Sequence, residues 1–374
     1  MKIQVLKFGG TSVATAQGRE LAIGKIIASR NAGYATAIVI SAMGRRGDPY
    51  ATDTLLDLIL EANENVTQRE LDMVSGTGEI ISGVVMAALL QKNGYKAMFL
   101  NSDQSGIRTN GVYREARVSR MDTKRVLSIL SEGGIPLIPS GQGTTEDGEL
   151  TMLGRGGGDT SATTVGVALN AESVVIYTDV NGIFSGDPRI IPEAKSISKI
   201  SYASCIDMAY LGSKVIHPRA VETAQENPNV KVYIRNIFTD EEGTLICADG
   251  KRDTIIGVAL QKDDTIFQGE VSADLKNRLS AMEINVYAVG VPGHFAIAQK
   301  DIKPFSGMAP DYKVADRLHK ISLVGDNSAV SADKIKEKYS AAFMHKASGF
   351  LSIWVRDNPE EATRRLHNEF CSNN

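Results

Sequence analysis

Short apolar segments alternate with amphipathic helical segments from the start of the chain to about residue 235, and this pattern constrains the fold more than any other feature. Residues 3–8, 35–42 and 172–180 read as strands, whereas 11–30 and 160–170 read as helices. Nearly continuous apolar strands that are joined by helices are typical of a mostly parallel sheet covered by helices on both faces. The sequence therefore predicts a three-layer α/β fold.

Polar residues stand at the carboxyl ends of three of these predicted strands. Lys7, Ser41 and Asp179 each come at or just after the end of an apolar run. Ligands of open parallel sheets bind beyond the carboxyl ends of the strands. We therefore expect these three residues, which are far apart in the sequence, to lie at one edge of the sheet.

The first candidate motif is "VLKFGGTSV", residues 5–13, in which Lys7 precedes Gly9 and Gly10. Glycines leave backbone N–H groups open to phosphate oxygens, and the helix that follows favours an anion at its N-terminus. Lys7 adds a point charge that can follow a phosphoryl group during transfer. Taken alone, a Gly-Gly pair after a strand is more often a simple turn.

The second motif is "TMLGRGGGDTSA", residues 151–162, where glycines including Gly158 surround Arg155. Arg155 can bind a carboxylate through two hydrogen bonds, and Asp159 can bind an amine or hold Arg155 in place. Asp159, with the two hydroxyl residues after it, is expected to cap the next helix. The alternative is a surface loop with a capping aspartate.

The third motif is "YTDVNGIFSGDPR", residues 177–189. This turn-rich stretch could wrap a nucleotide, with carboxylates on the ribose or base and Arg189 on a phosphate, although an irregular connection is an equal alternative. Lys214 lies further on in "GSKVIHPRAV", residues 212–221, where Pro218 fits the first turn of a helix.

The fourth site is Glu79 in "SGTGEIISGVV", residues 75–85. Gly76 and Gly78 leave the helix without side chains beside this carboxylate, which suggests that a ligand comes close. The alternative is a solvated charge on a helix surface.

After about residue 248 the pattern changes to two similar strand–helix–strand–strand units. The tripeptide "SAD" opens both helices, at 272–274 and 331–333, as an N-cap signal, and a last helix closes the chain. We therefore predict one domain at 1–247 and a tandem of small α+β units at 248–374.

Composition narrows the classes of partner. Lys and Arg total 41 against 44 Asp and Glu, so the formal net charge is −3. The chain therefore has no excess of positive charge that would favour binding to nucleic acid or to an anionic membrane. Cys205, Cys247 and Cys371 show no metal or disulfide spacing, which suits a reducing cytosol. No secretory h-region follows Lys2, and the longest apolar run, residues 84–90, is too short to span a bilayer. We expect a soluble, cytoplasmic protein with no protein metal site.

Taken together, these stretches resemble the aspartate kinases of the amino acid kinase family. The matching segments occur in the family's order over about residues 1–247, and the tail is similar to the two ACT units, of ferredoxin-like architecture, in those enzymes. The segments are "KFGGTSV", "SAMG", "TDTLL", "RELDM" with "SGTGEIIS", "LGRGGGDTSA", "YTDVNGIFSGDPR" and "GSKVIHPRAV".

The resemblance implies transfer of the γ-phosphate of ATP to the β-carboxylate of L-aspartate. The product, 4-phospho-L-aspartate, enters lysine, diaminopimelate, threonine and methionine synthesis. The resemblance implies catalytic roles for Lys7 and Asp159, with Mg²⁺ carried mainly by the phosphates, and a homodimer that forms through the tail. The implied ATP-binding residues are Lys7, Gly9, Gly10, Thr178, Asp179, Phe184, Asp187, Arg189 and Lys214. The implied aspartate-binding residues are Ser41, Thr52, Glu79, Arg155 and Gly158.

The chain departs from the family pattern at several positions. Gly158 stands where serine is usual, Phe184 where tyrosine is usual and Asn181 where aspartate is usual, but Lys7 and Arg155 are kept, so activity is expected. The tail lacks the Asp-x-Pro-Gly-type effector loop in 260–275 and 324–335, so feedback inhibition is expected to be weak or absent. The alternatives are another amino acid kinase, acting on acetylglutamate, glutamate, carbamate or a nucleoside monophosphate, and a non-catalytic amino-acid sensor.

Overall fold

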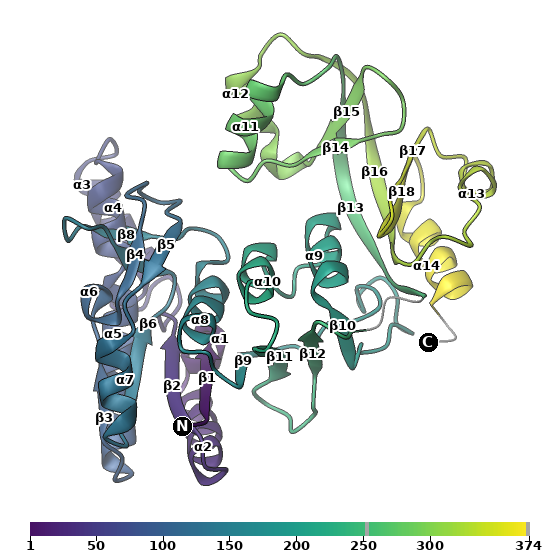
Figure 1. Ribbon diagram of the computed structural model, residues 1–374. Helices are drawn as coiled ribbons and strands as arrows, with labels where there is room; N and C mark the ends of the chain where they lie inside the picture. The colour runs from purple at the N-terminus through teal and green to yellow at the C-terminus, as the bar shows by residue number, and fades with distance from the viewer. Residues whose placement is uncertain (251–253, 372–374) are drawn as a thin grey trace. The chain divides into compact units, whose positions relative to one another are not determined.

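The computed structural model describes residues 1–250 and 254–371, and these form two compact units (Figure 1). The first unit comprises Met1–Ile183 and Ile216–Ala248, and the second comprises Phe184–Val215 and Asp249–Asn374. The sequence suggested one unbroken catalytic segment, 1–247, but the contacts group residues 184–215 with the C-terminal region. Residues 251–253 and 372–374 of the predicted tail lie outside the described residues.

The first unit is built on a mostly parallel sheet with the strand order β12-β11-β9-β1-β2-β6-β3. All neighbouring pairs in this order are parallel except β11 with β12. The strands are β1 (Ile3–Phe8), β2 (Ala35–Ile40), β3 (Ala97–Phe99), β6 (Ile135–Pro139), β9 (Ser173–Thr178), β11 (Lys231–Asn236) and β12 (Thr244–Cys247). The predicted α/β class is confirmed.

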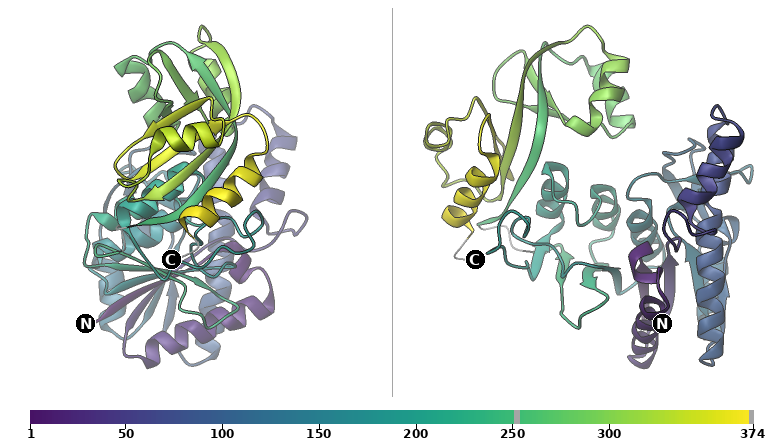
Figure 2. Two further views of the ribbon diagram at one scale, coloured as in Figure 1. Left: turned by 90° about the vertical axis from the view of Figure 1, so that its right-hand side faces the viewer. Right: turned by 180° about the vertical axis from the view of Figure 1, so that it is seen from behind.

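Helices cover both faces of this sheet, and Figure 2 shows the layers from two further directions. The helices are α1 (Gly10–Val13), α2 (Ala16–Asn31), α3 (Thr52–Ala62), α4 (Gln68–Ser75), α5 (Thr77–Lys92), α7 (Lys124–Ser131), α8 (Gly157–Ala168) and α10 (Pro218–Gln225). On one face, Ile26 of α2 and Leu90 of α5 pack with Phe8 and Ile40 of the sheet. Helices α7 and α8 contact the other face, and α10 packs against α8.

Two helix starts differ from the sequence expectation. The helix predicted at 11–30 is broken into α1 and α2, because Thr15 leaves the helical conformation and its hydroxyl accepts a hydrogen bond from Gly18 N at 3.0 Å. Helix α8 begins at Gly157, after Gly156 in a left-handed conformation, and has no side-chain cap. Asp159 is therefore in the first turn of α8 and is not its cap.

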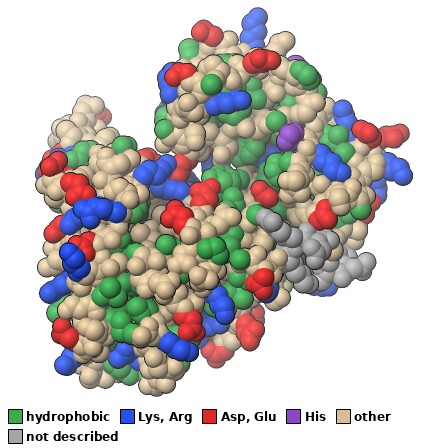
Figure 3. Space-filling model, viewed as in Figure 1, with side chains coloured by type: hydrophobic (Ala, Val, Ile, Leu, Met, Phe, Trp, Pro, Cys, Tyr) green, Lys and Arg blue, Asp and Glu red, His purple; other side chains and the backbone are tan. Residues whose placement is uncertain are grey.

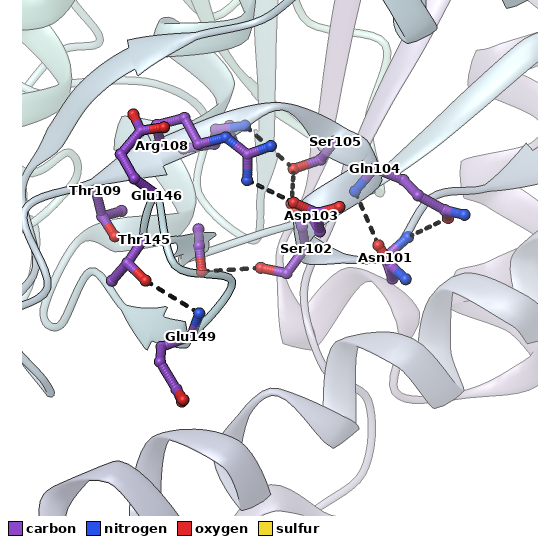
Figure 4. Close-up of polar contacts among 12 residues, drawn as sticks. Asn101, Ser102, Asp103, Gln104, Ser105, Arg108, Thr109, Thr145, Glu146 and Glu149 are labelled. Carbon is purple, nitrogen blue, oxygen red and sulfur yellow. Dashed lines mark hydrogen bonds and ion pairs between the residues drawn. The ribbon is translucent and has the colours of Figure 1, made fainter.

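A small sheet of the order β5-β4-β7-β8 completes the first unit, and the sequence analysis did not predict it. Its strands are β4 (Ile107–Thr109), β5 (Val118–Met121), β7 (Gln142–Thr144) and β8 (Leu150–Met152), and the short helix α6 (Ser102–Ser105) precedes β4. Figure 4 shows how α6 is tied to this sheet. Arg108 donates a hydrogen bond to Asp103 at 2.6 Å, and the Ser102 hydroxyl donates to the Gly143 carbonyl at 3.0 Å.

The second unit contains a six-stranded sheet of the order β14-β15-β13-β16-β18-β17. Its elements are β13 (Ile255–Gln268), α11 (Ala273–Ala281), β14 (Val286–Ala288), β15 (His294–Ile297), α12 (Ile302–Met308), β16 (Lys313–Gly325), α13 (Ala332–Lys338), β17 (Phe343–Lys346), β18 (Phe350–Val355) and α14 (Pro359–Phe370). Strand β10 (Lys199–Ser201) and helix α9 (Tyr202–Leu211) also belong to this unit. Ser272 caps α11 as predicted, whereas Ser331 precedes α13 without a side-chain cap.

The two predicted repeats share their central strands. The first half of β13 pairs with the second half of β16, and the second half of β13 pairs with the first half of β16 and with β15. Each half of the sheet therefore completes four strands by using part of β13 and part of β16. The sequence pattern ended the first strand near residue 260, but β13 continues to Gln268, so much of the segment expected to be a loop is strand.

A buried ion pair marks the place where β13 changes partner. Lys320 Nζ lies 3.9 Å from Asp264 Oδ2, both side chains are fully buried, and Trp354 Nε1 donates to the same carboxylate at 3.1 Å. Lys320 Nζ also lies 3.1 Å from the ring centroid of Tyr287. Burial lowers the pKa of Lys320 to about 8 and raises the pKa of Asp264. A slip of β13 against β16 would leave a charge buried and unpaired, so the pair disfavours other registers.

One helical stretch of the described chain, Gln68–Lys92, is long and apolar enough to cross a membrane by length and composition. Half of its most apolar window is buried, and Met86 and Leu90 pack in the core of the first unit, so it serves as a core helix here. Charged side chains of both signs are interspersed over the face shown in Figure 3, in agreement with the balanced composition.

Candidate active site

A cavity of about 290 Å³ lies in the first unit, where β1, β2 and β6 end. Its lining is rich in glycine and carries Lys7, Ser41, Glu79, Ser140, Gly141, Met152, Gly154, Gly156, Gly157, Gly158 and Asp159. The structure thus brings Lys7 and Ser41 to one site. Asp179 follows β9, the other neighbour of β1, but is exposed and does not line the cavity.

Lys7 is paired with Asp159 inside this cavity. Lys7 Nζ lies 2.8 Å from Asp159 Oδ1, and the side chains are 13% and 17% exposed. Helix α8 supplies Asp159 from its first turn and strand β1 supplies Lys7, so two rigid elements fix the pair. One sequence-based alternative had Asp159 holding Arg155, but its ionic partner is Lys7.

Small side chains keep the space beside Lys7 open. A methyl group on Gly9 would lie 3.5 Å from Lys7 Nζ, and one on Gly158 would lie 3.4 Å from Lys7 Cε and 3.3 Å from Ser140 Oγ. The Ser140 and Ser41 hydroxyl oxygens are 2.9 Å apart. A larger residue at Gly158 would therefore press on Lys7 and the serine pair, and glycine leaves that room to a ligand.

Glu79 also lines the cavity, from the first turn of α5. Its side chain accepts hydrogen bonds from Ala42 N at 3.2 Å and from Gln142 Nε2 at 3.4 Å. Burial raises the pKa of Glu79 to about 7. The carboxylate therefore changes charge near neutral pH, and an incoming cation would favour its ionised form.

The glycines on either side of Glu79 leave room for neighbouring parts of the chain. A side chain on Gly78 would collide with Thr52 and Ala42, and one on Gly76 would press on Leu150. The absence of side chains at these two positions allows α5 to contact the start of α3 and the loop after β2. The Thr52 Oγ1 atom is buried and has no hydrogen-bond partner among the described residues, so a ligand could use it.

Arg155 itself is exposed and does not line the cavity, although its loop does. Residues of "HPRAV", around the start of α10, brace this loop. Arg219 donates hydrogen bonds to the carbonyls of Leu153 at 2.9 Å and Arg155 at 2.6 Å. Gly156, at φ +70°, lies directly against His217, where a side chain would collide with the imidazole ring. The placement of the loop therefore depends on α10.

Replacing Arg219 by alanine is expected to raise the KM for aspartate, the acceptor that the sequence resemblance implies, about tenfold while changing kcat less than threefold. The substitution removes two charge-assisted hydrogen bonds to loop carbonyls, each worth about 1.5–3 kcal/mol. Initial rates at varied aspartate and saturating ATP measure the effect, and Arg117→Ala, on the chain before β5, is the control. An unchanged KM would show that Arg219 does not position the loop.

Asp72 is a second residue whose role the sequence pattern did not reveal, although it lies in "RELDM". Its carboxylate is fully buried and accepts hydrogen bonds from the backbone N–H groups of Arg114 and Met152, both at 2.9 Å. Helix α4 is thereby fixed to the end of β8, next to the glycine-rich loop. Asp72 thus stabilises the wall of the cavity without lining it.

The turn after β9 is held by side-chain hydrogen bonds within the first unit. Thr178 Oγ1 donates to Asp179 Oδ1 at 3.2 Å, and Asn236 Nδ2 donates to Asn181 Oδ1 at 2.6 Å. Asn181 is used here as an acceptor, and an aspartate could fill this role equally. Asp179 therefore stands on a well-ordered turn at the end of the strand next to β1.

Four of the predicted nucleotide residues belong to the second unit: Phe184, Asp187, Arg189 and Lys214. Phe184 is half-buried and Lys214 is exposed. Arg189 pairs with Asp187 at 2.9 Å and 2.6 Å, and this hydrogen bonding lowers the pKa of Asp187. Within residues 1–250 and 254–371, no group of three or more acidic, His or Cys side chains could hold a metal ion.

The arrangement in the first unit defines a ligand by charge. Lys7 provides a cation near small, hydroxyl-bearing neighbours, and Glu79 provides a carboxylate with a raised pKa in the same cavity. Such a site can bind an ammonium group through Glu79 and stabilise added negative charge through Lys7.

Comparisons with known proteins agree with this geometry. The model of the amino acid kinase family matches residues 2–236. The chain is 41% identical over 276 residues to aspartokinase 1 of Bacillus subtilis, covering 72% of this chain and 68% of that protein. It is 36% identical over 305 residues to the aspartokinase of Thermus thermophilus, covering 79% and 74%.

The fold is similar to the crystal structure of E. coli aspartokinase III in complex with aspartate and ADP. The TM-score is 0.80 at 21% identity, and the match covers 98% of this chain and 99% of that chain. The likeness extends through both units, so the shared fold includes the C-terminal sheet. The chain belongs to the amino acid kinase family and, within it, to the aspartokinases.

Proposed function

We propose that this protein transfers the γ-phosphoryl group of ATP to the β-carboxylate of L-aspartate and forms 4-phospho-L-aspartate. The observation that carries the proposal is the placement of Lys7 and Glu79 in one glycine-lined cavity. The aspartokinase relatives, which match more than two thirds of the chain, supply the acceptor.

The proposed reaction needs no general base, because the β-carboxylate is already a nucleophile. Its oxygen attacks the γ-phosphorus, the bond to the β–γ bridging oxygen breaks, and ADP leaves with that electron pair. Lys7 stabilises the negative charge on the transferring group, and Asp159 holds the ammonium of Lys7 at 2.8 Å in position. Catalysis thus consists of positioning and charge stabilisation.

The substrate amino acid is proposed to bind with its ammonium on Glu79. Thr52, with its unpartnered buried hydroxyl, and the Ser41 hydroxyl are available to its oxygens. Arg155 is proposed to bind the α-carboxylate, which requires its exposed side chain to turn toward the cavity. The Gly158 position, small enough to spare the serine pair, borders this site.

ATP is proposed to contact Lys7 and the backbone of Gly9 and Gly10 in the first unit. The other proposed contacts are Thr178 and Asp179 in the first unit and Phe184, Asp187, Arg189 and Lys214 in the second. Mg²⁺ would be held mainly by the phosphate oxygens of ATP. The ion supplies charge neutralisation of the phosphates.

A coupled assay for ADP tests the acceptor. ADP formation is expected with L-aspartate and not with N-acetylglutamate, glutamate, carbamate or a nucleoside monophosphate. Turnover with one of those acceptors in place of aspartate would assign the chain to another branch of the family. Aspartate binding without any turnover would point to an amino-acid sensor.

Lysine and threonine are expected to inhibit weakly or not at all. The connections that lead into α11 and α13, Gly269–Ser272 and 326–331, are short and lack the Asp-x-Pro-Gly pattern. Initial rates at subsaturating aspartate test this expectation. Each amino acid is added at concentrations up to about 10 mM, roughly a hundred times the dissociation constant of a tight effector. Strong inhibition by sub-millimolar lysine would contradict it.

The assembly and location follow from the same resemblance. A homodimer that forms through the sheet of the second unit and a cytoplasmic location are proposed. Cys205, Cys247 and Cys371 are buried, and this is compatible with a reducing compartment.

A further inference from the structure

We propose that the C-terminal helix α14 positions the nucleotide loop, residues 184–195, through His367 and Arg364, so that ATP affinity depends on this helix. The inference rests on the proposed assignment of Phe184, Asp187 and Arg189 to ATP. Every contact that carries it lies within the second unit.

The first anchor is a hydrogen bond between His367 Nε2 and the Ser185 hydroxyl oxygen, which are 2.8 Å apart. His367 and Ser185 are both buried, with 2% and 6% of their surface exposed. Ser185 is the residue after Phe184, so the anchor adjoins the first proposed ATP contact in the loop.

Ser185 also closes the loop on itself and joins it to the sheet. Its hydroxyl accepts from Lys195 N at 3.0 Å, and its backbone N–H donates to the Lys195 carbonyl at 2.9 Å. Its own carbonyl accepts from Val258 N of β13 at 2.7 Å. The imidazole of His367 therefore contacts the point where both ends of the loop meet.

The second anchor lies on the other side of the charged pair. Arg364 Nε donates to the Ile190 carbonyl at 2.8 Å, one residue after Arg189. The Asp187 carbonyl accepts from Ile190 N at 2.9 Å and from Ile191 N at 2.8 Å, which makes a compact turn. The segment 186–189, with Asp187 and Arg189, is thus fixed by α14 at both of its ends.

The position of α14 is itself set by the core of the second unit. Leu366 packs with Ile321 of β16 and Ile353 of β18, and Thr363 Oγ1 donates to the Pro359 carbonyl at 2.6 Å. Arg364 and His367 are three residues apart and so share one face of the helix. That face meets the loop while Leu366 holds the helix on the sheet.

The test compares Arg364→Ala and His367→Ala with Arg365→Ala. The side chain of Arg365 is 69% exposed and pairs with Glu361 at 2.9 Å, and within the described residues it makes no hydrogen bond to the loop, so it matches Arg364 in type and helix position. We expect each of the first two variants to raise the KM for ATP five- to tenfold, while the KM for aspartate and kcat change less than twofold. Arg365→Ala is expected to behave like the wild type.

Two further measurements separate positioning from loss of folding. Ser185→Ala removes the first anchor without altering α14. The double variant Ser185→Ala/His367→Ala should have a KM for ATP no higher than that of the more impaired single variant, because both substitutions remove the same hydrogen bond. Calorimetric titration with ADP should show the same five- to tenfold loss without any acceptor. Unchanged ATP and ADP constants, or equal changes in the constants for ATP and aspartate, would overturn the inference.

The same titration distinguishes this inference from the proposed function. If the wild type binds ADP but does not phosphorylate aspartate, the proposed function fails while the loop variants still test the role of α14. If the wild type binds no adenine nucleotide, both are overturned.

Discussion

Replacing Lys7 by alanine is expected to lower kcat about 10³-fold and to leave the KM for aspartate within threefold of the wild type. Lys7 is the only lysine in the cavity lining, and removing one charge-stabilising donor from a preorganised site costs about 10²–10³ in rate. Aspartate binding is assigned to other residues and should survive. Steady-state kinetics with ATP and aspartate varied in turn gives both constants.

Lys2→Ala is the matched control for this change. Lys2 is adjacent to the same strand, but its side chain is 74% exposed and lies 3.5 Å from Glu172. This variant should keep wild-type rates. Near-normal turnover by Lys7→Ala would remove the role proposed for Lys7, whereas a large rise in the KM for aspartate would place Lys7 in acceptor binding.

Replacing Glu79 by glutamine is expected to raise the KM for aspartate about 100-fold. The change removes the carboxylate proposed to pair with the substrate ammonium, and truncating one partner of a buried charge pair costs about 2–5 kcal/mol. Ala42 N can still donate to the amide oxygen, so the fold around position 79 should be kept.

The pH dependence of aspartate binding follows from the raised pKa of Glu79. Because this pKa is about 7, the side chain is neutral below pH 7 and cannot pair with an ammonium group. The KM for aspartate of the wild type should therefore fall about fivefold as pH rises from 6 to 7, because the ionised fraction of Glu79 rises from about 0.1 to about 0.5, and then level off. In Glu79→Gln this dependence should disappear, and persistence of the same profile would assign it to another group.

The same substitution is expected to stabilise the free protein above pH 7. The pKa of Glu79 rises from 4.5 in the unfolded chain to about 7 in the folded protein, so its contribution to stability is full below pH 4.5 and is lost as pH rises through 7. The loss is at most about 3 kcal/mol. Thermal unfolding at pH 8 should therefore give a higher Tm for Glu79→Gln, and a lower Tm would show that the buried charge is compensated.

Much of the site could be predicted from the sequence, because the ends of the strands can be recognised from where apolar runs stop. Apolar runs that stop at Lys7 and Ser41 show where parallel strands of a covered sheet end, and such ends meet at one edge. The glycine-dense loop at Arg155 signalled close approach, and four of its glycines line the cavity. These signals are local, so they survive without knowledge of tertiary contacts.

The partners of the site residues could not be predicted in this way. Asp159 pairs with Lys7 across 152 positions of sequence, and Arg219 braces a loop that lies 64 positions away. Such pairs depend on how α8 and α10 pack, which no local pattern contains. The length of β13 was also hidden, because its charged middle, including Asp263 and the buried Asp264, has the composition of a loop.

Trapping the reaction product with hydroxylamine tests the central claim most directly. Acyl phosphates react with hydroxylamine to give hydroxamates, so mass spectrometry can identify which carboxyl group was phosphorylated. The proposed mechanism predicts β-aspartyl hydroxamate in an amount equal to the ADP released, and neither product from Lys7→Ala above about 0.1% of the wild-type rate. ADP release without an aspartyl hydroxamate, or a hydroxamate at the α-carboxyl group, would contradict it.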